Sequence, residues 1–418
     1  MRTVGLITEY NPFHNGHLHH LQESRRVADA EVAVAVMSGH FLQRGEPALV
    51  DKWRRTRMAL AAGVDVVVEL PFPWACNSAP LFAEGAVRCL ESLGSIDALC
   101  FGSEAGSLAD LQVAAKLLED QSGAIDKGTR ELLRQGRNYP AARAQVVAGL
   151  AGESEARLLA GPNNILGIEY LRALVRLNSG MTPLTIPRVG AGYHDEQAVG
   201  QIASATGIRA MLRRGEAVGD YLPPASAALL AEARLEGQIS DPDVFLRLLA
   251  AVIARDPAAL DAIYQVEHGL ADRLLAVVRA SDDLDGLIGA VKARHLTRTR
   301  VQRLLCYVLL GARRDEMEEA LQAGPRFLHL LGCSERGRHW LARTRKDRSL
   351  PLVQNYSRVR ATLKRAYGTS SAACAQALRQ LDLEERATQL YGLLLQRRPP
   401  GSLQRDYSQS VVGPEISR

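Results

Sequence analysis

The amino-acid sequence predicts an α/β domain built on a parallel sheet, followed by a domain of helices. Through the first hundred residues, short apolar β-branched runs alternate with helix-length amphipathic stretches, a pattern typical of a parallel sheet covered by helices on both faces. Each predicted strand ends in polar, proline or glycine residues, and open α/β sheets bind their ligands at that end of the strands. After residue 200 the Leu and Ala periodicity of helices continues almost without interruption.

The expected elements of the first part follow one another closely. Strands are expected over 3–7, 31–37, 64–70 and 97–101, and helices over 16–28, 52–62 and 79–93. A helical stretch over 107–171 precedes a last strand at 184–189 and a glycine-rich loop at 190–194. We therefore expect an α/β domain at 1–200, a basic helical domain at 201–396, and a flexible tail at 397–418 that is rich in proline, glycine and serine.

Composition excludes several classes of protein. With 418 residues, of which 47% are hydrophobic, the chain is long enough for two globular domains and is not a disordered sequence. Its longest apolar stretches, at 32–37 and 304–310, are far shorter than the roughly 20 residues that cross a bilayer. The N-terminus has no signal or transit pattern, and the six cysteines form no CxxC pair. We expect a cytoplasmic protein with reduced thiols and no membrane partner.

Positive charge is concentrated in the second part of the chain. Residues 1–200 carry 19 Lys and Arg against 22 Asp and Glu, and residues 201–418 carry 32 against 24. Within that part, residues 291–365 hold 18 basic and 6 acidic residues. Such a segment either binds a polyanion or forms a solvated arginine-rich surface. If the partner is RNA, the contacts are expected from Arg298, Arg300 and Arg303. The alternative surface within the same segment comprises Arg336, Arg338, Arg343, Arg345 and Lys346.

The most informative motif is Asn11-Pro12-Phe13-His14-Asn15-Gly16-His17, directly after the first strand and before a helix. At such a turn, two histidines three residues apart can direct both imidazoles and the free N–H groups of the helix at one anion. The alternatives are a metal site and incidental surface histidines. No carboxylate or third histidine stands at ligand spacing, and His19 and His20 point to other helix faces. We therefore favour phosphate binding and expect no metal-ligating residues.

Six segments, of which the first contains this motif, occur in order along the chain and carry a resemblance to a known family. They are ITEYNPFHNGH, AVMSGHFLQRGEPALVDKW, ELPFPWACNSAPLFAEGAV, LCFGSE, PNNILGIEY and RVGAGYHD. The HxGH element is similar to that of the Rossmann-like nucleotidyltransferases related to class I aminoacyl-tRNA synthetases. The series as a whole resembles the bacterial tRNA(Met) cytidine acetate ligase family over about residues 1–200, with LTRTRVQRLL as a weaker match in the helical part.

The resemblance implies an ATP-dependent ligase that forms N4-acetylcytidine at the wobble position of elongator tRNA(Met). Acetate would attack ATP to give acetyl-AMP, the cytidine amine would then displace AMP, and Mg²⁺ would accompany ATP. The catalytic residues implied are His14 and His17. The implied ATP site comprises Ile7, Thr8, Glu9, Tyr10, Asn11, Pro12, Phe13, His14, Asn15, Gly16, His17, Leu18, His19, His20, Gly102, Asn163 and Arg188.

Some of these residues have ordinary structural alternatives. Gly102 is equally a turn glycine, Asn163 a helix cap and Arg188 a surface arginine. Weaker candidates for completing the pocket are Ser38-Gly39, Gln43–Glu46, Asp51–Arg54 and Glu104, with helix capping as the rival role of Asp51 and Glu104.

Three rival functions share parts of this pattern. A small-molecule adenylyl- or cytidylyltransferase has the same HxGH element, although the long basic helical part argues against it. A nucleotide-regulated RNA-binding protein would need no turnover. An acetyl-CoA-dependent acetyltransferase would need a glycine-rich pyrophosphate loop of the RxxGxG type, which we do not find in the sequence.

Overall fold

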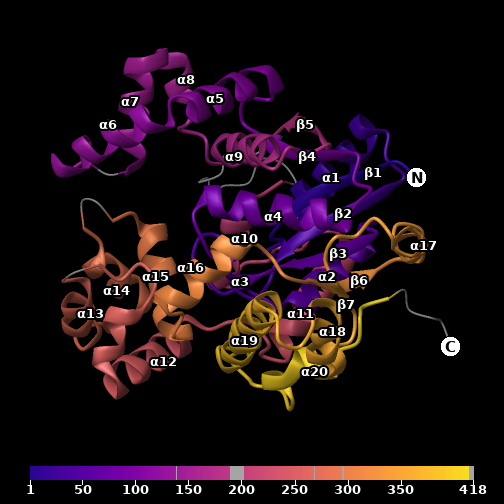
Figure 1. The fold of residues 1–418 in the computed structure, drawn as a ribbon. Helices are drawn as coiled ribbons and strands as arrows, with labels where there is room; N and C mark the ends of the chain where they lie inside the picture. The colour runs from indigo at the N-terminus through magenta and orange to yellow at the C-terminus, as the bar shows by residue number, and fades with distance from the viewer. Residues whose placement is uncertain (138, 189–201, 268, 294–295, 414–418) are drawn as a thin grey trace.

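One seven-stranded sheet organises the protein, here a computed structural model that describes residues 1–137, 139–188, 202–267, 269–293 and 296–413 (Figure 1). Its order is β5-β4-β1-β2-β3-β6-β7. The first five strands are mutually parallel, β6 is antiparallel to β3, and β7 is parallel to β6. The strands are β1 (Thr3–Thr8), β2 (Val32–Ser38), β3 (Val66–Leu70), β4 (Ala98–Ser103), β5 (Thr182–Pro187), β6 (Leu328–Cys333) and β7 (Leu352–Val353).

Helices cover both faces of this sheet and extend beyond it. They are α1 (Asn15–Ala28), α2 (Lys52–Ala61), α3 (Phe72–Ala75), α4 (Ala79–Leu93), α5 (Leu108–Asp120), α6 (Ser122–Arg134), α7 (Tyr139–Ala151), α8 (Glu153–Leu158), α9 (Pro162–Arg176), α10 (Ala205–Arg213), α11 (Pro224–Leu235), α12 (Pro242–Arg255), α13 (Leu270–Val278), α14 (Leu284–Val291), α15 (Arg298–Leu310), α16 (Arg314–Ala323), α17 (Glu335–Arg343), α18 (Val359–Tyr367), α19 (Ala372–Leu393) and α20 (Arg405–Ser408).

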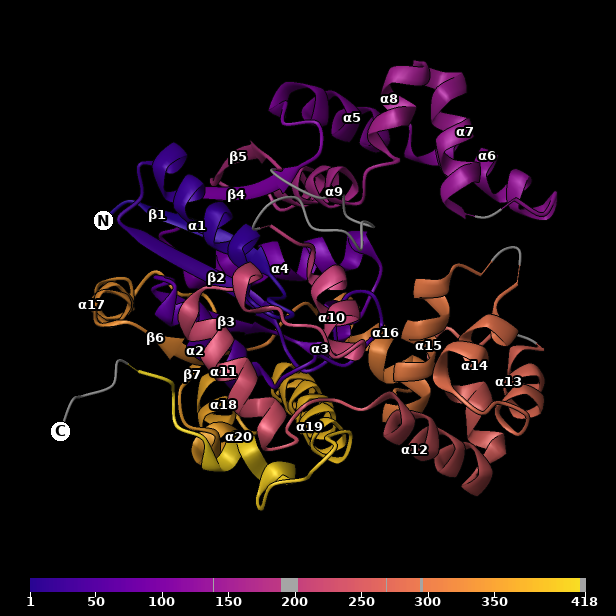
Figure 2. The same ribbon diagram turned by 180° about the vertical axis from the view of Figure 1, so that it is seen from behind.

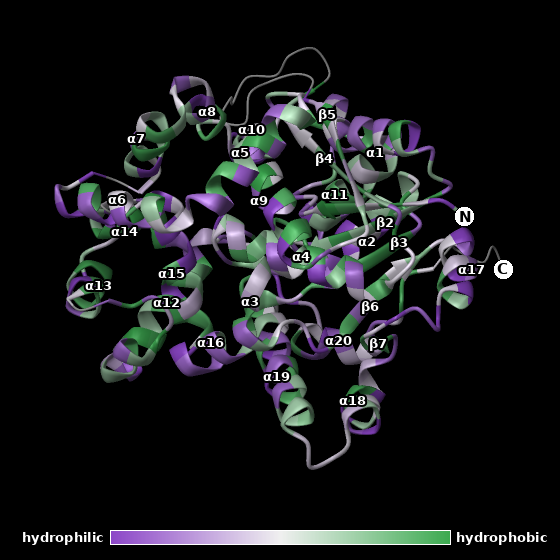
Figure 3. Cartoon of the chain, turned by 45° about the horizontal axis from the view of Figure 1, so that its top comes forward, coloured by the Kyte–Doolittle hydropathy of each residue, from purple (hydrophilic) through white to green (hydrophobic). Residues whose placement is uncertain are grey.

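The central strand β2 shows why the sheet is buried on both sides. Val34 and Val36 face a core that includes α4 and α9, whereas Ala35 and Met37 face a core that includes α1, α2, α10 and α11. Side chains alternate between faces with a period of two, so a strand covered on both faces must be apolar throughout. All seven residues of β2 are buried. Figure 3 shows the same hydrophobic concentration in the strands, with polar residues on outlying helices such as α17.

The predicted α/β fold is confirmed. For most elements the observed ends differ from the predicted ends by one or two residues. The expected helix over 79–93 is α4, and the expected strand over 184–189 is β5, which begins at Thr182 and ends at Pro187. The glycine-rich loop predicted at 190–194 lies outside the described residues. The six cysteines are free, and all but Cys333 are buried, as expected. Among the described residues, no helix is long and apolar enough to cross a membrane.

The second part of the chain is not wholly helical, which corrects the expectation for residues 201–396. Strands β6 and β7 come from this part and complete the sheet begun by the first 200 residues. The run Leu328–Cys333 is apolar and short, and periodicity cannot distinguish such a strand from a buried helix segment. Pairing with β3 decides the matter, because it satisfies the backbone groups of both strands.

The C-terminal segment is also packed, so the predicted flexibility of 397–418 is wrong for residues 397–413. Val412 accepts a hydrogen bond from Cys333 N–H and donates one to the Leu331 carbonyl, both at 2.9 Å, and so extends the sheet edge. Asp406 is buried at 3% exposure. Composition alone indicates disorder for this segment, because composition does not show that a distant residue pairs with the Asp406 carboxylate.

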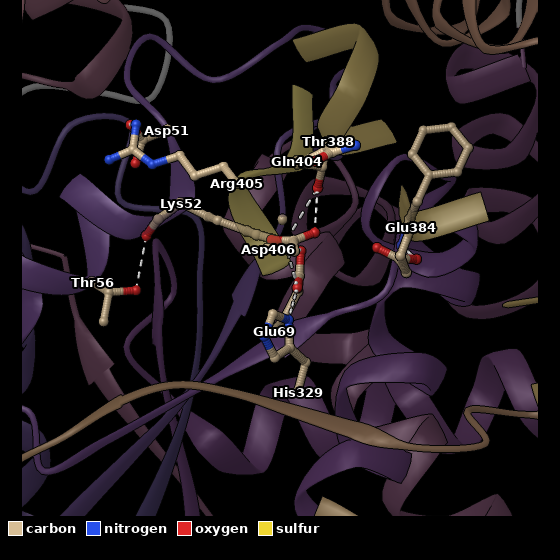
Figure 4. A network of polar contacts seen from close by, with 12 residues as sticks. Asp51, Lys52, Thr56, Glu69, His329, Glu384, Thr388, Gln404, Arg405 and Asp406 are labelled. Carbon is tan, nitrogen blue, oxygen red and sulfur yellow. Dashed lines mark hydrogen bonds and ion pairs between the residues drawn. The ribbon is translucent and has the colours of Figure 1, made fainter. Parts of the chain in front are cut away.

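That distant residue is Lys52, the centre of a buried polar network (Figure 4). Its ammonium forms 2.8 Å ion pairs with Glu69 and with Asp406. His329 contacts Glu69 at 2.6 Å, and the Thr388 hydroxyl donates to Asp406 at 2.6 Å. Burial alone would lower the pKa of Lys52, but the two carboxylates raise it above its usual value, and Lys52 in turn holds the pKa of Glu69 at about 2 despite burial.

Two helical lobes project from the same side of the sheet (Figures 1 and 2). The first, here called the arm, comprises α5–α8 and is inserted between β4 and α9. The second comprises α12–α15 and has its own apolar core, which continues onto Phe41, Phe72 and Tyr391 of the sheet-bearing part. The sheet thus forms a base from which two lobes extend.

We predict that Lys52→Met destabilises the fold by about 3 to 5 kcal/mol, because it leaves two buried carboxylates without their cation. Chemical denaturation at pH 7 measures this as a lower midpoint. The triple variant Lys52→Met, Glu69→Gln, Asp406→Asn removes the unpaired charges as well and should lose less stability than the single variant. A single variant as stable as wild type would mean that the network contributes nothing to folding.

Candidate nucleotide-binding site

A pocket of ≈ 230 Å³ lies at the carboxyl ends of β1 and β4. From β1 the sheet continues through β2 on one side and through β4 on the other, which makes this the topological switch point where open α/β sheets bind ligands. The walls come from the ends of β1, β4 and β5 and from the first turns of α1, α9 and α10. They include Thr8, Glu9, His14, His17, His20, Gly102, Asn163, Arg188, Ser204 and Arg209.

The two histidines of the motif are oriented by the backbone of the turn. His14 is the N-cap of α1, and its Nδ1 accepts a hydrogen bond from Gly16 N–H at 3.1 Å. His17 Nδ1 accepts from His14 N–H at 3.2 Å, and the two rings lie 3.8 Å apart. Because each Nδ1 is an acceptor, each neutral ring carries its proton on Nε2. The turn therefore sets both the orientation and the tautomer of both imidazoles.

Burial and neighbouring cations keep these imidazoles neutral. Burial is the larger cause, and Arg188 and Arg209 add to it, so that the pKa of His14 is lowered to about 3. The pKa of His17 is lowered well below its usual value by burial, with His14, His20 and Arg188 contributing. Burial and Arg188 also lower the pKa of His20 to about 4. The pocket thus holds neutral N–H donors beside fixed guanidinium charges, a combination suited to a polyphosphate.

Glycine is required at position 16 of the motif. A Cβ on Gly16 would lie 2.8 Å from His14 Cε1 and would push that ring from its position. Gly102, in contrast, has room: a Cβ there would lie 3.5 Å from Arg188 Cγ and 3.8 Å from His20 Cδ2. Its missing side chain is therefore not a packing requirement, and it leaves space between two pocket residues.

The opposite wall is held together by a chain of polar contacts. Glu104, just beyond β4, accepts hydrogen bonds from the N–H groups of Asn163 at 3.1 Å and Asn164 at 2.7 Å. It therefore caps α9 from outside the helix, the rival role foreseen for it. Asn163 is not the cap. Its Nδ2 donates to Glu104 at 2.6 Å and its Oδ1 accepts from Arg188 at 3.0 Å, so it sets the position of the Arg188 guanidinium.

The structure brings most, but not all, of the predicted ATP-binding segment into the pocket. Of residues 7–20, Pro12, Phe13, Asn15 and Leu18 do not line it. Phe13 is fully buried in the core, and Asn15 donates to the Asp220 carbonyl at 2.9 Å. Asp51 caps α2, because its carboxylate accepts a hydrogen bond from Arg54 N–H at 2.8 Å. Helix capping is the alternative that the sequence offered to a role in the pocket.

The sequence patterns did not single out two arginines that build the site. Arg209 of α10 donates to the Asn11 carbonyl at 2.9 Å and to Glu46 at 2.7 Å, and it lines the pocket. Arg55 is fully buried and donates to the carbonyls of Glu9 at 2.7 Å and Ser38 at 2.9 Å, as well as to Gly39. No local motif marks either residue, because the carbonyl groups that both contact, and the Glu46 carboxylate that Arg209 contacts, are brought near only by the fold.

The arginines predicted to contact RNA divide into two kinds. Arg298 pairs with Asp285 and Arg300 with Glu267 on the surface of the second lobe. Arg303 is 9% exposed and donates to the Gln43 carbonyl at 3.2 Å, so it belongs to the packing between α15 and the loop after β2. We therefore correct the expectation for Arg303, whose buried side chain is not available to a partner.

Comparison with known proteins agrees with this arrangement. The family described as HIGH nucleotidyl transferase matches residues 1–406. The tRNA(Met) cytidine acetate ligase of Syntrophotalea carbinolica is 55% identical over 414 residues, which cover 99% of both chains. The enzyme of the same name from Bacillus subtilis is 39% identical and covers 85% of this chain and 88% of its own. A crystal structure of Thermotoga maritima TmcAL bound with α-thio ATP is 33% identical and covers 99% of both chains, with a TM-score of 0.89.

The neutral state of His14 leads to a prediction of how the stability of the protein depends on pH. The pKa of His14 falls from about 6.5 in the unfolded chain to about 3 in the fold, so the unfolded state binds the extra proton and stability is lost as pH falls from 6.5 towards 3. His14→Asn keeps an N-cap acceptor without a titrating group. The free energy of unfolding of this variant should fall less steeply with pH than that of the wild type. The two slopes should differ by up to about 1.4 kcal/mol per pH unit between pH 6 and 4. Parallel curves from denaturation at each pH would contradict the neutral state assigned to His14.

Proposed function

The chain belongs to the HIGH nucleotidyl transferase family and, within it, to the tRNA(Met) cytidine acetate ligases, and on that basis we propose that it uses ATP to join acetate to a cytidine of tRNA(Met). The observation that carries the proposal is the pair of neutral imidazoles, His14 and His17, at the N-terminus of α1 and at the switch point of the sheet. The finer assignment is N4-acetylation of the wobble cytidine in elongator tRNA(Met), in the cytoplasm.

In the first step a carboxylate oxygen of acetate attacks the α-phosphorus of ATP, pyrophosphate leaves, and acetyl-AMP forms. Negative charge develops on the phosphate oxygens in that transition state. His14 and His17 donate Nε2–H groups, the N-terminus of α1 adds its dipole, and Arg188 adds a full charge on the side of Asn163. Because the histidines enter the reaction neutral, they stabilise charge as hydrogen-bond donors.

In the second step the exocyclic amine of cytidine attacks the acetyl carbon, AMP leaves, and the amine loses a proton. No covalent protein intermediate is required, which agrees with a pocket whose described lining contains no cysteine. Glu9 lines the pocket with a carboxyl group whose pKa is raised, mainly by burial. Its Oε1 accepts one hydrogen bond, from Gln43 N–H at 2.8 Å. Glu9 is the pocket residue that would hold a Mg²⁺ ion accompanying the phosphates.

Nucleoside mass spectrometry tests the function directly. Unmodified tRNA(Met) incubated with the protein, ATP and acetate should yield acetylated cytidine, and omission of either ATP or acetate should abolish the product. Acetyl-CoA should not replace the pair. Folded protein that leaves the tRNA unmodified would overturn the proposal. A product formed from acetyl-CoA alone would identify a different acetyl donor.

Adenylation can be isolated by acetate-dependent exchange of pyrophosphate into ATP. His17→Ala should slow this exchange by about a hundredfold or more, the effect of removing one donor from a preorganised anion site, and should leave tRNA affinity nearly unchanged. His339→Ala, an exposed histidine on α17, is the matched control and should exchange at the wild-type rate. Exchange at the wild-type rate in His17→Ala would exclude the phosphate role of His17.

A further inference from the structure

The arm formed by α5–α8 is fixed to the nucleotide pocket at both of its ends. It begins just after Glu104 and ends just before Asn163, and these two residues are hydrogen-bonded to each other. Arg143 of α7 pairs at 3.1 Å with the buried Glu169 of α9. These contacts join the arm to the pocket wall, so a molecule that binds along the arm is placed relative to the pocket.

Helix α6, near the end of this arm, presents three cations along one face. Lys127, Arg130 and Arg134 follow one another at spacings of three and four residues, one turn apart each time, and all three are exposed. The other side of the helix packs on α7: Ile125 and Thr129 are buried, and a Cβ on Gly128 would lie 3.0 Å from Val146. We call these three cations the α6 stripe.

The cations of the α6 stripe are not paired with acidic side chains. Within the described ranges, none of the three forms an ion pair with a carboxylate, and the only side-chain hydrogen bond among them runs from Arg130 to the Asp126 carbonyl at 3.2 Å. The predicted arginines of α15 differ, because Arg298 and Arg300 already pair with carboxylates. An unpaired cation binds a phosphate without first breaking an ion pair, so the stripe is the better surface for a polyanion.

A second exposed basic cluster lies too far from the chemistry. This cluster comprises Arg343, the last residue of α17, and Arg345 and Lys346 just after it. The start of α17 packs against Asp65, and its Arg336 donates to the Glu31 carbonyl. Both of these partners precede a strand, so α17 lies at the amino ends of β2 and β3, whereas the pocket lies at the carboxyl ends of the strands. Figures 1 and 2 show α17 on the opposite side of the sheet from the arm.

We infer that the α6 stripe binds the sugar-phosphate backbone of the tRNA and positions its cytidine over the pocket. The inference rests on the proposed function and goes beyond it, since it names the surface that receives the RNA. Contacts with phosphates set register and orientation without reading sequence. The stripe should therefore contribute to the affinity for any tRNA, and the choice of cytidine should be made in the pocket.

The test measures the affinity for a tRNA(Met) transcript at several salt concentrations. The variant Lys127→Gln, Arg130→Gln, Arg134→Gln keeps helix propensity and removes three charges. Its Kd should rise about tenfold or more at low salt, and the slope of log K against log salt should become shallower by about two units or more. Acetate-dependent pyrophosphate exchange should stay at the wild-type rate, which also reports that the pocket is folded.

The matched control, Arg343→Gln, Arg345→Gln, Lys346→Gln, makes the same charge change near the amino ends of the strands and should leave affinity and slope unchanged. An unchanged Kd and slope in the stripe variant would overturn the inference, as would an equal loss in the control. A loss confined to Arg298→Gln, Arg300→Gln would place the RNA on α15 and overturn it as well. A wild-type protein that binds tRNA without acetylating it would refute the proposed function and leave the stripe supported.

Discussion

The buried ammonium of Lys52 is the interaction on which the arrangement of the molecule depends. It joins the start of α2 to the next strand, β3, through Glu69, and to α20, more than 300 residues further along the chain, through Asp406. A buried charge is stable only when its partners are in place, so the C-terminal segment cannot leave without removing one of the two carboxylates that pair with Lys52. Gly39 belongs to the same constraint, because a Cβ there would collide with the Glu69 carboxylate.

Helix α2 also positions part of the nucleotide pocket. Arg55 lies three residues after Lys52 and fixes the carbonyl groups at the ends of β1 and β2, including that of Glu9 in the pocket wall. The buried charges of α2 therefore lie directly behind part of the pocket wall. Each group in the pocket is held by a neighbour whose role is to position it: Gly16 for His14, His14 for His17, and Asn163 for Arg188. Preorganisation of this kind is what electrostatic stabilisation of a transition state requires.

The pocket and the lobes differ in the size of the molecule that each can contact. A pocket of ≈ 230 Å³ is far too small to enclose a tRNA, which needs an extended surface. The arm and the α12–α15 lobe both extend from one side of the sheet (Figures 1 and 2). Because the arm is inserted between two pocket-lining segments, it extends the pocket wall without disturbing the strand order of the sheet.

Local pattern determined the parallel sheet, the turn that carries His14 and His17, and most element limits in the first hundred residues, because alternation and helix-start signals depend on neighbours in the chain. The family resemblance supplied Gly102, Asn163 and Arg188, whose local patterns had ordinary alternatives. Only the tertiary structure decided that β6 joins the sheet, that Asp406 is buried, that Arg303 is buried rather than exposed, and that Arg55 and Arg209 build the site. Each of these depends on a partner far away in sequence, and a single charged residue in a sequence does not indicate whether its counter-charge will be water, a carbonyl group or a carboxylate.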